Sequence, residues 1–370
     1  MIIGKKSRKT VDMKLALINL PIDINVGGNL QRYALCRTLH NIGIDVTHIQ
    51  LRFHYHIPIW KKPYVYTKRL LLKILLGRNI EIFNESKQNK LYLDSLNQIL
   101  PFYDKYVHHT DPVYDVKKLN KIITDFDAVL VGSDQVWRKK IANRYLRTML
   151  LDFIPDTMPC FAYAVSFGGA ENEFTSKDAK MFQSLYGKFK MVSVREKSGI
   201  DMLAELECTN PKAIHLLDPT FLVPKSEYEI IASRAQSKCA LDGDMFCYIL
   251  DKNENKSRKI EQLAEEKCLT PFGMTLDSNV NIEQWLLSYC KAKYIVTDSY
   301  HGMVFALIFN KPFYVFENKF RGNERFKSIQ ETFGITNNEV NPDWVEINEI
   351  IRIETDKSHN FIKKIMRYEQ

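Results

Sequence analysis

Short apolar runs alternate with longer segments whose apolar residues recur at helical spacing, and this alternation restricts the chain to few folds. The strand-like runs are residues 15–20, 44–51, 128–131, 160–167, 191–194, 245–250, 294–297 and 313–316. The helical segments include residues 30–39, 181–189, 256–265, 282–289 and 303–309. Strands and helices that alternate in this way build parallel sheets covered on both faces. The sequence therefore predicts an α/β protein.

The chain has 370 residues, which favours two lobes because a single core rarely grows beyond about 250–300 residues. The alternation stops near residues 219–226 and then resumes, so we expect two Rossmann-like lobes whose parallel sheets face a cleft. The predicted divisions are a disordered leader at 1–12, an N-terminal lobe at 13–221 with an insertion at 52–90, a C-terminal lobe at 222–342 and a helical tail at 343–370.

The composition is that of a globular protein, with 45% hydrophobic and 26% charged residues. Seven cysteines are scattered singly, with no Cys-x-x-Cys pair. This usage is typical of reduced thiols in a cytoplasmic protein and argues against a disulfide framework. The sequence contains no His, Cys and carboxylate cluster with metal-ligand spacing, so we predict no metal site.

The net charge of +8 suits an anionic ligand, an anionic membrane surface or nucleic acid. No helix-turn-helix, zinc-finger or RNA-binding aromatic signature accompanies it, which argues against nucleic acid. Within the insertion, residues 57–78 combine aromatic residues with a basic amphipathic helix. Two interpretations stay open: a helix packed on its own lobe with a solvated basic face, or a peripheral contact with the inner face of the membrane or a lipid-linked acceptor.

The first candidate site follows the first strand, at Asn25-Val-Gly-Gly-Asn-Leu-Gln. Two glycines let a backbone turn tightly and approach a ligand, and the following helix points free N–H groups at it. The stretch is not Gly-x-Gly-x-x-Gly, so a nicotinamide or flavin cofactor is poorly supported. The candidates are Asn25, Gly27, Gly28, Asn29 and Gln31. A plain strand-to-helix turn capped by Asn29 is the alternative.

The second candidate site is Gly132-Ser-Asp-Gln, at the end of the run 128–131. Ser133, Asp134 and Gln135 would emerge at the carboxyl edge of the sheet, where open α/β folds bind their ligands. These side chains suit sugar hydroxyls, or Asp134 could act as a base. The alternative is a structural turn, with Trp137 buried in the core.

The third candidate site is Asp298-Ser-Tyr-His-Gly, where the run 294–297 gives way to a helix. Asp298 and Ser299 are good N-cap types, which places His301 and Gly302 in the first helical turn. The positive end of the helix dipole disfavours charge on His301 unless an anion binds close by, so the position suits a phosphate or carboxylate. A satisfied core histidine is the alternative.

Arg195 leaves the end of the run 191–194. An arginine can grip a carboxylate or phosphate with two parallel hydrogen bonds, whereas a surface pair with Glu196 is the alternative. Arg325 is a further candidate cation.

These motifs occur in an order that resembles one family, the polysaccharide pyruvyl transferases. The motifs are Asn25-x-Gly-Gly-x-Leu-Gln, Val131-Gly-Ser-Asp-Gln-Val-Trp, Ser193-Val-Arg-Glu, Asp218-Pro-Thr-Phe-Leu, Thr297-Asp-Ser-Tyr-His-Gly, Phe309-Asn-Lys-Pro-Phe and Arg325-Phe. The resemblance runs from Met13 to about residue 335. It implies a glycosyltransferase-B-like fold and transfer of a pyruvyl group from phosphoenolpyruvate to a glycan of an exopolysaccharide, capsule or cell wall.

The resemblance also implies roles. Arg195 and His301 would hold the donor together with Ser299, Gly302 and Arg325, while the Ser133–Gln135 loop and the Asn25–Gln31 turn would line the cleft. We expect phosphoenolpyruvate as donor substrate, no cofactor, and a glycan or lipid-linked oligosaccharide as acceptor. His301 would protonate the donor and Asp134 would accept a proton from the sugar. The alternatives are a nucleotide-sugar glycosyltransferase of the same fold and a non-catalytic glycan or lipid-carrier binding protein.

Overall fold

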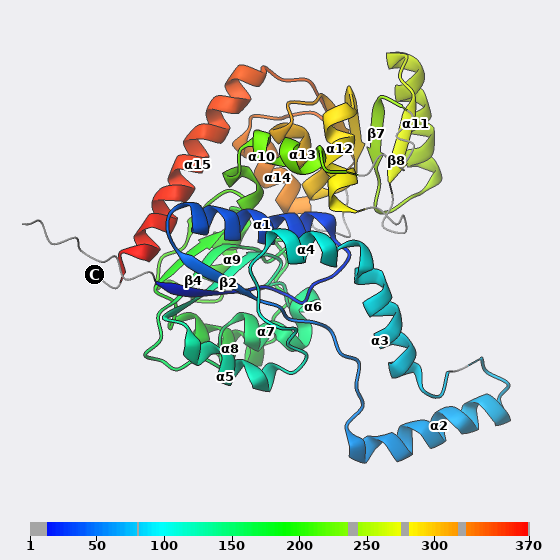
Figure 1. Cartoon of the computed structure of the whole chain (residues 1–370), viewed down its shortest axis with the longest axis vertical. Coiled ribbons are helices and arrows are strands. Elements are labelled where there is room, and N and C mark those ends of the chain that lie inside the picture. Colours follow the sequence, from blue (N-terminus) through cyan, green and yellow to red (C-terminus); the bar gives the residue numbers. More distant parts are fainter. Residues whose placement is uncertain (1–12, 80, 236–242, 275–280, 317–322, 369–370) are drawn as a thin grey trace, which may run out of the picture.

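The computed structural model describes residues 13–79, 81–235, 243–274, 281–316 and 323–368, and it contains two sheets in series (Figure 1). The predicted leader at 1–12 lies outside the described residues. Both sheets are built mainly from parallel strands with helices between them, which confirms the predicted fold class.

The first sheet has six parallel strands in the order β2-β1-β3-β4-β5-β6. Their bounds are β1 Lys14–Ile18, β2 Asp45–Ile49, β3 Ala128–Asp134, β4 Cys160–Val165, β5 Met191–Val194 and β6 Ile214–His215. Alternate residues of β1 enter opposite cores: Leu15 and Leu17 face one, and Ala16 and Ile18 the other. Burial on both faces is why these strands are continuous apolar runs.

Helices cover each face of the first sheet. The helix α1 (Val26–Asn41) and the helix α4 (Leu100–Tyr106) contribute to the core that contains Leu15. The opposite core receives side chains from α5 (Leu119–Ile122), α6 (Lys139–Ala142), α7 (Leu146–Met149), α8 (Ser176–Tyr186) and α9 (Ser198–Glu205). Trp137 fills this second core, where its Nε1 donates to the Met149 carbonyl at 3.1 Å.

The second sheet has five strands in the order β11-β10-β9-β7-β8. Their bounds are β7 Met245–Tyr248, β8 Pro271–Met274, β9 Tyr294–Thr297, β10 Phe313–Val315 and β11 Glu339–Val340. The helices of this part are α11 Glu254–Lys267, α12 Ile282–Lys291, α13 Tyr300–Ile308 and α14 Asn323–Thr332. The edge strand β11 runs antiparallel to β10, so the expectation of a wholly parallel sheet was wrong at this edge.

Two segments connect the sheets. A 3-10 turn at Pro219–Leu222 leads into α10 (Lys225–Ala232), and the predicted helical tail forms α15 (Trp344–Met366). Figure 1 shows α15 running from the second sheet back to the first. There Phe361 contacts Tyr163, with ring centroids 6.1 Å apart, and Thr355 Oγ1 donates to the Phe221 carbonyl at 3.5 Å. The tail thus packs on both parts of the chain.

The insertion between β2 and β3 forms a projecting arm. Its elements are a 3-10 turn at Ile59–Lys61, α2 (Lys62–Leu75) and α3 (Asn84–Ser95), and α2 stands away from both sheets (Figure 1). No helix among the described residues is long and apolar enough to cross a bilayer.

Each sheet has a point where the strand order reverses, between β1 and β3 and between β7 and β9. Open α/β folds bind ligands beyond the carboxyl ends of the strands at such points. Residues that follow β3, β5 and β9 meet there, and they form the candidate site.

Candidate active site

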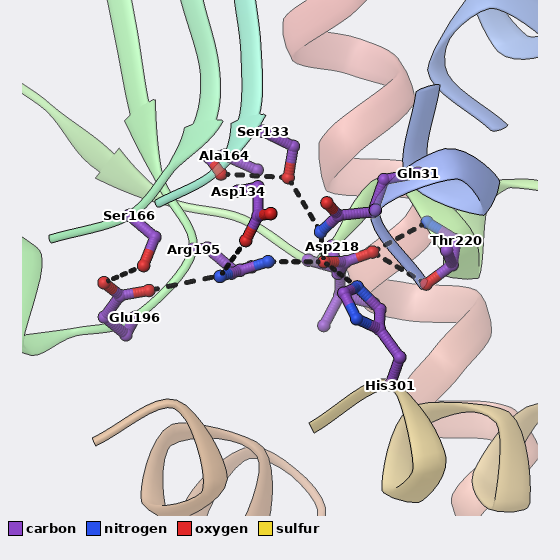
Figure 2. A network of polar contacts seen from close by, with 12 residues as sticks. Gln31, Ser133, Asp134, Ala164, Ser166, Arg195, Glu196, Asp218, Thr220 and His301 are labelled. Atoms are coloured by element: carbon purple, nitrogen blue, oxygen red, sulfur yellow. Dashed lines mark hydrogen bonds and ion pairs between the residues drawn. The ribbon is translucent and has the colours of Figure 1, made fainter. Parts of the chain in front are cut away.

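Arg195 lies at the centre of a buried polar network at the carboxyl end of β5 (Figure 2). Its Nη1 donates to Asp218 Oδ2 at 3.0 Å, and its Nη2 donates to Asp134 Oδ1 at 3.3 Å. Glu196 Oε2 lies 3.8 Å from the Arg195 Nε atom. The Arg195 and Glu196 side chains are 1% and 0% exposed, so the alternative of a surface ion pair was wrong.

Asp218 joins residues from both parts of the chain. It precedes the 3-10 turn that follows β6, and Thr220 donates to its Oδ1 from the backbone nitrogen at 3.0 Å and from the hydroxyl at 2.7 Å. Its Oδ2 accepts from Arg195 and from Gln31 of α1, and lies 3.7 Å from His301 Nε2. Asp218 therefore holds an arginine from one lobe near a histidine from the other.

His301 sits in the first turn of α13, as the sequence predicts, because Ser299 is the N-cap residue. The imidazole is 4% exposed, and its Nε2 has no hydrogen-bond partner within the described part of the chain. The alternative of a satisfied core histidine was therefore wrong. At 3.7 Å, the Asp218 carboxylate acts on His301 through charge rather than through a hydrogen bond.

The first turn of α1 packs directly against His301. A Cβ atom added at Gly27 would lie 2.1 Å from His301 Nδ1 and 2.6 Å from its Cβ, whereas one at Gly28 would meet no described atom closer than 3.6 Å. The N-cap is Asn25, whose Oδ1 accepts from the Gly28 nitrogen at 3.3 Å. The alternative of an Asn29 cap was therefore wrong, and the tight turn expected at the glycines is a helical turn.

This close approach yields a stability prediction. Gly27→Ala forces α1 and α13 apart, and we expect it to lower the free energy of unfolding by about 1–3 kcal/mol, as overpacking does. Gly28→Ala is the matched control, because its new methyl group meets only ordinary contacts and raises helix propensity by up to about 1 kcal/mol. Urea denaturation measures both. Equal stability of the two variants would contradict the packing of His301 on Gly27.

Ser133 and Asp134 emerge together at the end of β3, with φ angles of 28° and 68°. Such angles are uncommon outside glycine and often occur at functional sites. Ser133 Oγ donates to the Ala164 carbonyl at 3.1 Å and accepts from Gln31 Nε2 at 3.3 Å. The Asp134 side chain keeps 24% of its surface exposed, so it is the network carboxylate most open to a ligand among those that contact Arg195.

Arg325 joins the site from α14 through Tyr300. Two guanidiniums lie close to the Tyr300 ring, with Arg195 Cζ 4.7 Å and Arg325 Cζ 5.3 Å from its centroid. Burial and the charge of Arg195 lower the pKa of Arg325 to about 10, so it stays charged at neutral pH. Tyr300, which connects these two cations, was not among the residues predicted from the sequence.

The charges of the network support one another. Burial alone would raise the pKa of Asp134, yet Arg195, His301 and Arg325 hold it below its ordinary value. The pKa of Asp218 is held far below its ordinary value, since His301, Arg195 and Thr220 outweigh the effect of burial. Burial likewise opposes the charge of Arg195, but the Tyr300 hydroxyl and the carboxylates of Asp134, Asp218 and Glu196 raise its pKa. Both aspartates are therefore ionised at neutral pH.

The other predicted residues lie around this network without entering it. Gln135 accepts from Arg138 at 2.8 Å. Asn29 is buried and donates to the Asp23 and Asn25 carbonyls, both at 2.9 Å. Gly302 allows α13 to approach β9, because a Cβ there would lie 2.0 Å from Thr297 Oγ1. In the structure these three residues contact protein groups around the network.

Asp298 was predicted as a possible N-cap, but it binds elsewhere. Its carboxylate accepts from the Leu250 and Asp251 nitrogens at 2.7 and 3.0 Å and from Lys256 Nζ at 2.6 Å. It thereby ties the end of β9 to the loop after β7. Within the described ranges, no group of three or more His, Cys, Asp or Glu side chains is arranged to hold a metal ion.

Two network carboxylates were missed by the sequence reading. Asp218 was named only as the first residue of a family motif and was given no role in the site, although a carboxylate that follows the apolar pair Leu216-Leu217 at a sheet edge is a signal for one. Glu196 was considered only as a surface partner of Arg195. In the structure its Oε1 accepts from Ser166 Oγ at 2.6 Å and from the Phe167 and Gly168 nitrogens at 2.9 and 3.1 Å.

Solved structures with a similar fold include two sugar-nucleotide enzymes. The UDP-GlcNAc 2-epimerase of Methanocaldococcus jannaschii is 13% identical, with a TM-score of 0.50 over 96% of this chain and 100% of that one. The UDP-N-acetylglucosamine 2-epimerase of Rickettsia bellii is 11% identical, with a TM-score of 0.46 over 96% and 98%. The fold is glycosyltransferase-B-like, as the resemblance implied.

No curated protein sequence matches the chain. The model of one family, polysaccharide pyruvyl transferase, matches residues 25–319. This range begins at the N-cap of α1 and includes Asp134, Arg195, Asp218 and His301. The chain therefore belongs to the polysaccharide pyruvyl transferase family of transferases.

Proposed function

We propose that the protein transfers a pyruvyl group from phosphoenolpyruvate to two hydroxyls of a glycan, forming a cyclic ketal. The observation that carries this proposal is the meeting of Arg195, Arg325, His301 and Asp134 beyond the carboxyl ends of both sheets, in a chain of the pyruvyl transferase family. A donor with a carboxylate and a phosphate needs cations, a proton donor and a proton acceptor, and this set includes all three.

The reaction forms two new C–O bonds at C2 of the donor. One sugar hydroxyl bonds to C2 while C3 takes up a proton, and a neighbouring hydroxyl then displaces phosphate from C2 to close the ring. The two hydroxyls lose two protons: one is matched by the proton that C3 takes up as it becomes a methyl group, and the other leaves with phosphate. A phosphate ion and a pyruvyl ketal are the products.

In this proposal the donor carboxylate replaces Asp134 on Arg195. The Asp134 contact, at 3.3 Å, is the longer of the two hydrogen bonds that Arg195 makes, and Asp134 is partly exposed whereas Asp218 is buried. Once released from Arg195, Asp134 loses a charge that depresses its pKa and becomes a better base. It then accepts the proton of the attacking hydroxyl.

His301 acts as the proton donor. It lies at the N-terminus of α13, where an anion such as the donor phosphate is favoured. In its protonated form its Nε2, which lacks a hydrogen-bond partner in the described ranges, would contact the phosphate and deliver a proton to C3 or to the leaving group. Arg325 adds a second positive charge beside the Tyr300 ring.

The proposal is tested by incubating the protein with phosphoenolpyruvate and a panel of glycans, soluble and lipid-linked. We expect release of inorganic phosphate that depends on the glycan, and a glycan product that carries a pyruvyl ketal in mass spectrometry. Release of a nucleoside diphosphate from a sugar nucleotide, without phosphate from phosphoenolpyruvate, would instead indicate a glycosyltransferase. Calorimetric binding of phosphoenolpyruvate without any product across the panel would indicate a non-catalytic binding protein.

A further inference from the structure

The projecting helix α2 presents an apolar face that nothing in the described chain covers. No residue of α2 is buried. The exposed side chains include Trp60 at 76%, Tyr64 at 70%, Leu71 at 50%, Ile74 at 68% and Leu75 at 72%. The alternative in which this helix packs on its own lobe was therefore wrong.

These apolar residues share one face of the helix. Within α2, Leu71 lies seven positions after Tyr64, three before Ile74 and four before Leu75, and residues at such spacings share a face. Trp60 lies in the 3-10 turn that precedes the helix, four positions before Tyr64. The opposite face is fixed to the arm: Arg69 pairs with Glu85 at 2.7 Å and donates to the Ile82 carbonyl at 2.9 Å. Tyr66 also contacts Phe83, with ring centroids 5.1 Å apart. The free face thus points away from α3.

The charged residues of the segment that contains α2 are all basic. Residues 57–78 contain six basic residues, Lys61, Lys62, Lys68, Arg69, Lys73 and Arg78, and no acidic residue. The whole chain has a net charge of +8, so the rest of the molecule contributes 8 − 6 = +2. An exposed apolar face flanked by lysines fits a lipid bilayer, which has an apolar interior and can carry anionic headgroups at its surface.

We propose that α2 is a membrane-docking helix that lies on an anionic lipid surface, with Trp60, Leu71 and Ile74 in the acyl boundary and the lysines at the headgroups. A second copy of the chain fits less well, because two copies of the segment 57–78, each of charge +6, would face each other. Trp60, stacked under Lys61 Nζ at 4.7 Å, has the amphipathic character of residues found at membrane interfaces. The inference concerns binding to lipid and does not depend on the donor or the acceptor.

The test is co-sedimentation of the full chain with vesicles that contain no substrate. At about 0.15 M salt we expect binding to mixed phosphatidylcholine–phosphatidylglycerol vesicles and little binding to pure phosphatidylcholine. The triple change Lys61→Gln, Lys68→Gln and Lys73→Gln should weaken the binding roughly 100-fold, at about fivefold for each charge. The triple change Trp60→Ser, Leu71→Ser and Ile74→Ser should weaken it at least as much.

Matched controls remove the same chemistry elsewhere on the surface. Lys117→Gln, Lys118→Gln and Lys121→Gln remove three exposed lysines, and Ile141→Ser, Ile230→Ser and Val345→Ser remove three exposed apolar side chains. Both controls should bind vesicles like the unchanged protein. Equal losses in the controls, or no vesicle binding at all, would overturn the proposal. A dimer seen by analytical ultracentrifugation that the Trp60 variant dissociates, without vesicle binding, would assign the face to a second copy instead.

Discussion

Replacing His301 with glutamine is expected to lower the rate of pyruvyl transfer by roughly 10²–10⁴-fold, the range over which a positioned acid or base contributes. Glutamine keeps a hydrogen-bonding group of similar length near Asp218 but cannot deliver a proton. The imidazole is buried, is favourably placed for an anion at the start of α13, and is pressed against Gly27. The measurement is steady-state release of phosphate from phosphoenolpyruvate with the glycan that the panel identifies.

The control for this variant is His108→Gln, which changes an exposed histidine outside the network. It should leave both turnover and the thermal unfolding temperature unchanged. If His301→Gln retained near-normal turnover with an intact fold, proton delivery by His301 would be wrong. The assignment of the chain to its family would stand in that case, because it does not rest on this residue alone.

Replacing Asp218 with asparagine is expected to lower the free energy of unfolding by about 3–5 kcal/mol and to reduce activity as well. Asp218 is fully buried and makes the shortest carboxylate contact with Arg195, so its removal leaves that buried charge only the longer contacts with Asp134 and Glu196. Asparagine can still accept hydrogen bonds from Thr220, but its amide nitrogen would then face the Arg195 and Gln31 donors, so the change removes the charge together with these two contacts. Urea denaturation at neutral pH measures the effect.

The difference in unfolding free energy between the unchanged protein and Asp218→Asn depends on pH in one direction. Because the folded-state pKa of Asp218 is depressed, its stabilisation is fully present above the ordinary aspartate pKa of about 3.9 and is lost as the pH falls through the folded value. The gap between the unchanged protein and Asp218→Asn should therefore be equal at about pH 7 and pH 5 and narrow only in stronger acid.

Asp356→Asn is the control for Asp218→Asn, because it removes an exposed carboxylate that pairs with Arg352 at 3.2 Å. Exposed pairs of this kind contribute little. The control should unfold like the unchanged protein. A gap for Asp218→Asn that disappears between pH 7 and pH 5 would contradict an ionised Asp218 in the folded state.

The sequence predicts most of the first lobe because its strands are buried on both faces. The run 191–194 matches β5 at both ends, and His301 lies in the first helical turn where the N-cap pattern placed it. The short strands β6, β8 and β11 were missed. The strands β6 and β11 have two residues each, too few for a periodic pattern to stand out, and β8 contains a proline and a glycine, which are uncommon in strands.

The site was harder to predict because its contacts connect distant parts of the chain. Gln31 meets Asp218 across 187 positions, and no local pattern reports such a contact. The same limit applies to Gly27, which looked like a turn glycine but serves the packing of His301. Arg195 was predicted to bind a ligand directly, because the sequence could not show that it already donates hydrogen bonds to two aspartates.

The position of α15 has a consequence for the order in which the protein matures. Phe361, Ile362 and Ile365 enter the same core as Tyr163 of β4, although almost two hundred positions separate them. A ribosome completes the six strands of the first sheet long before it releases this helix. Until then the part of this face that α1 and α4 do not cover stays open to water, so we expect the first lobe to depend on chaperones during synthesis more than a self-contained domain does.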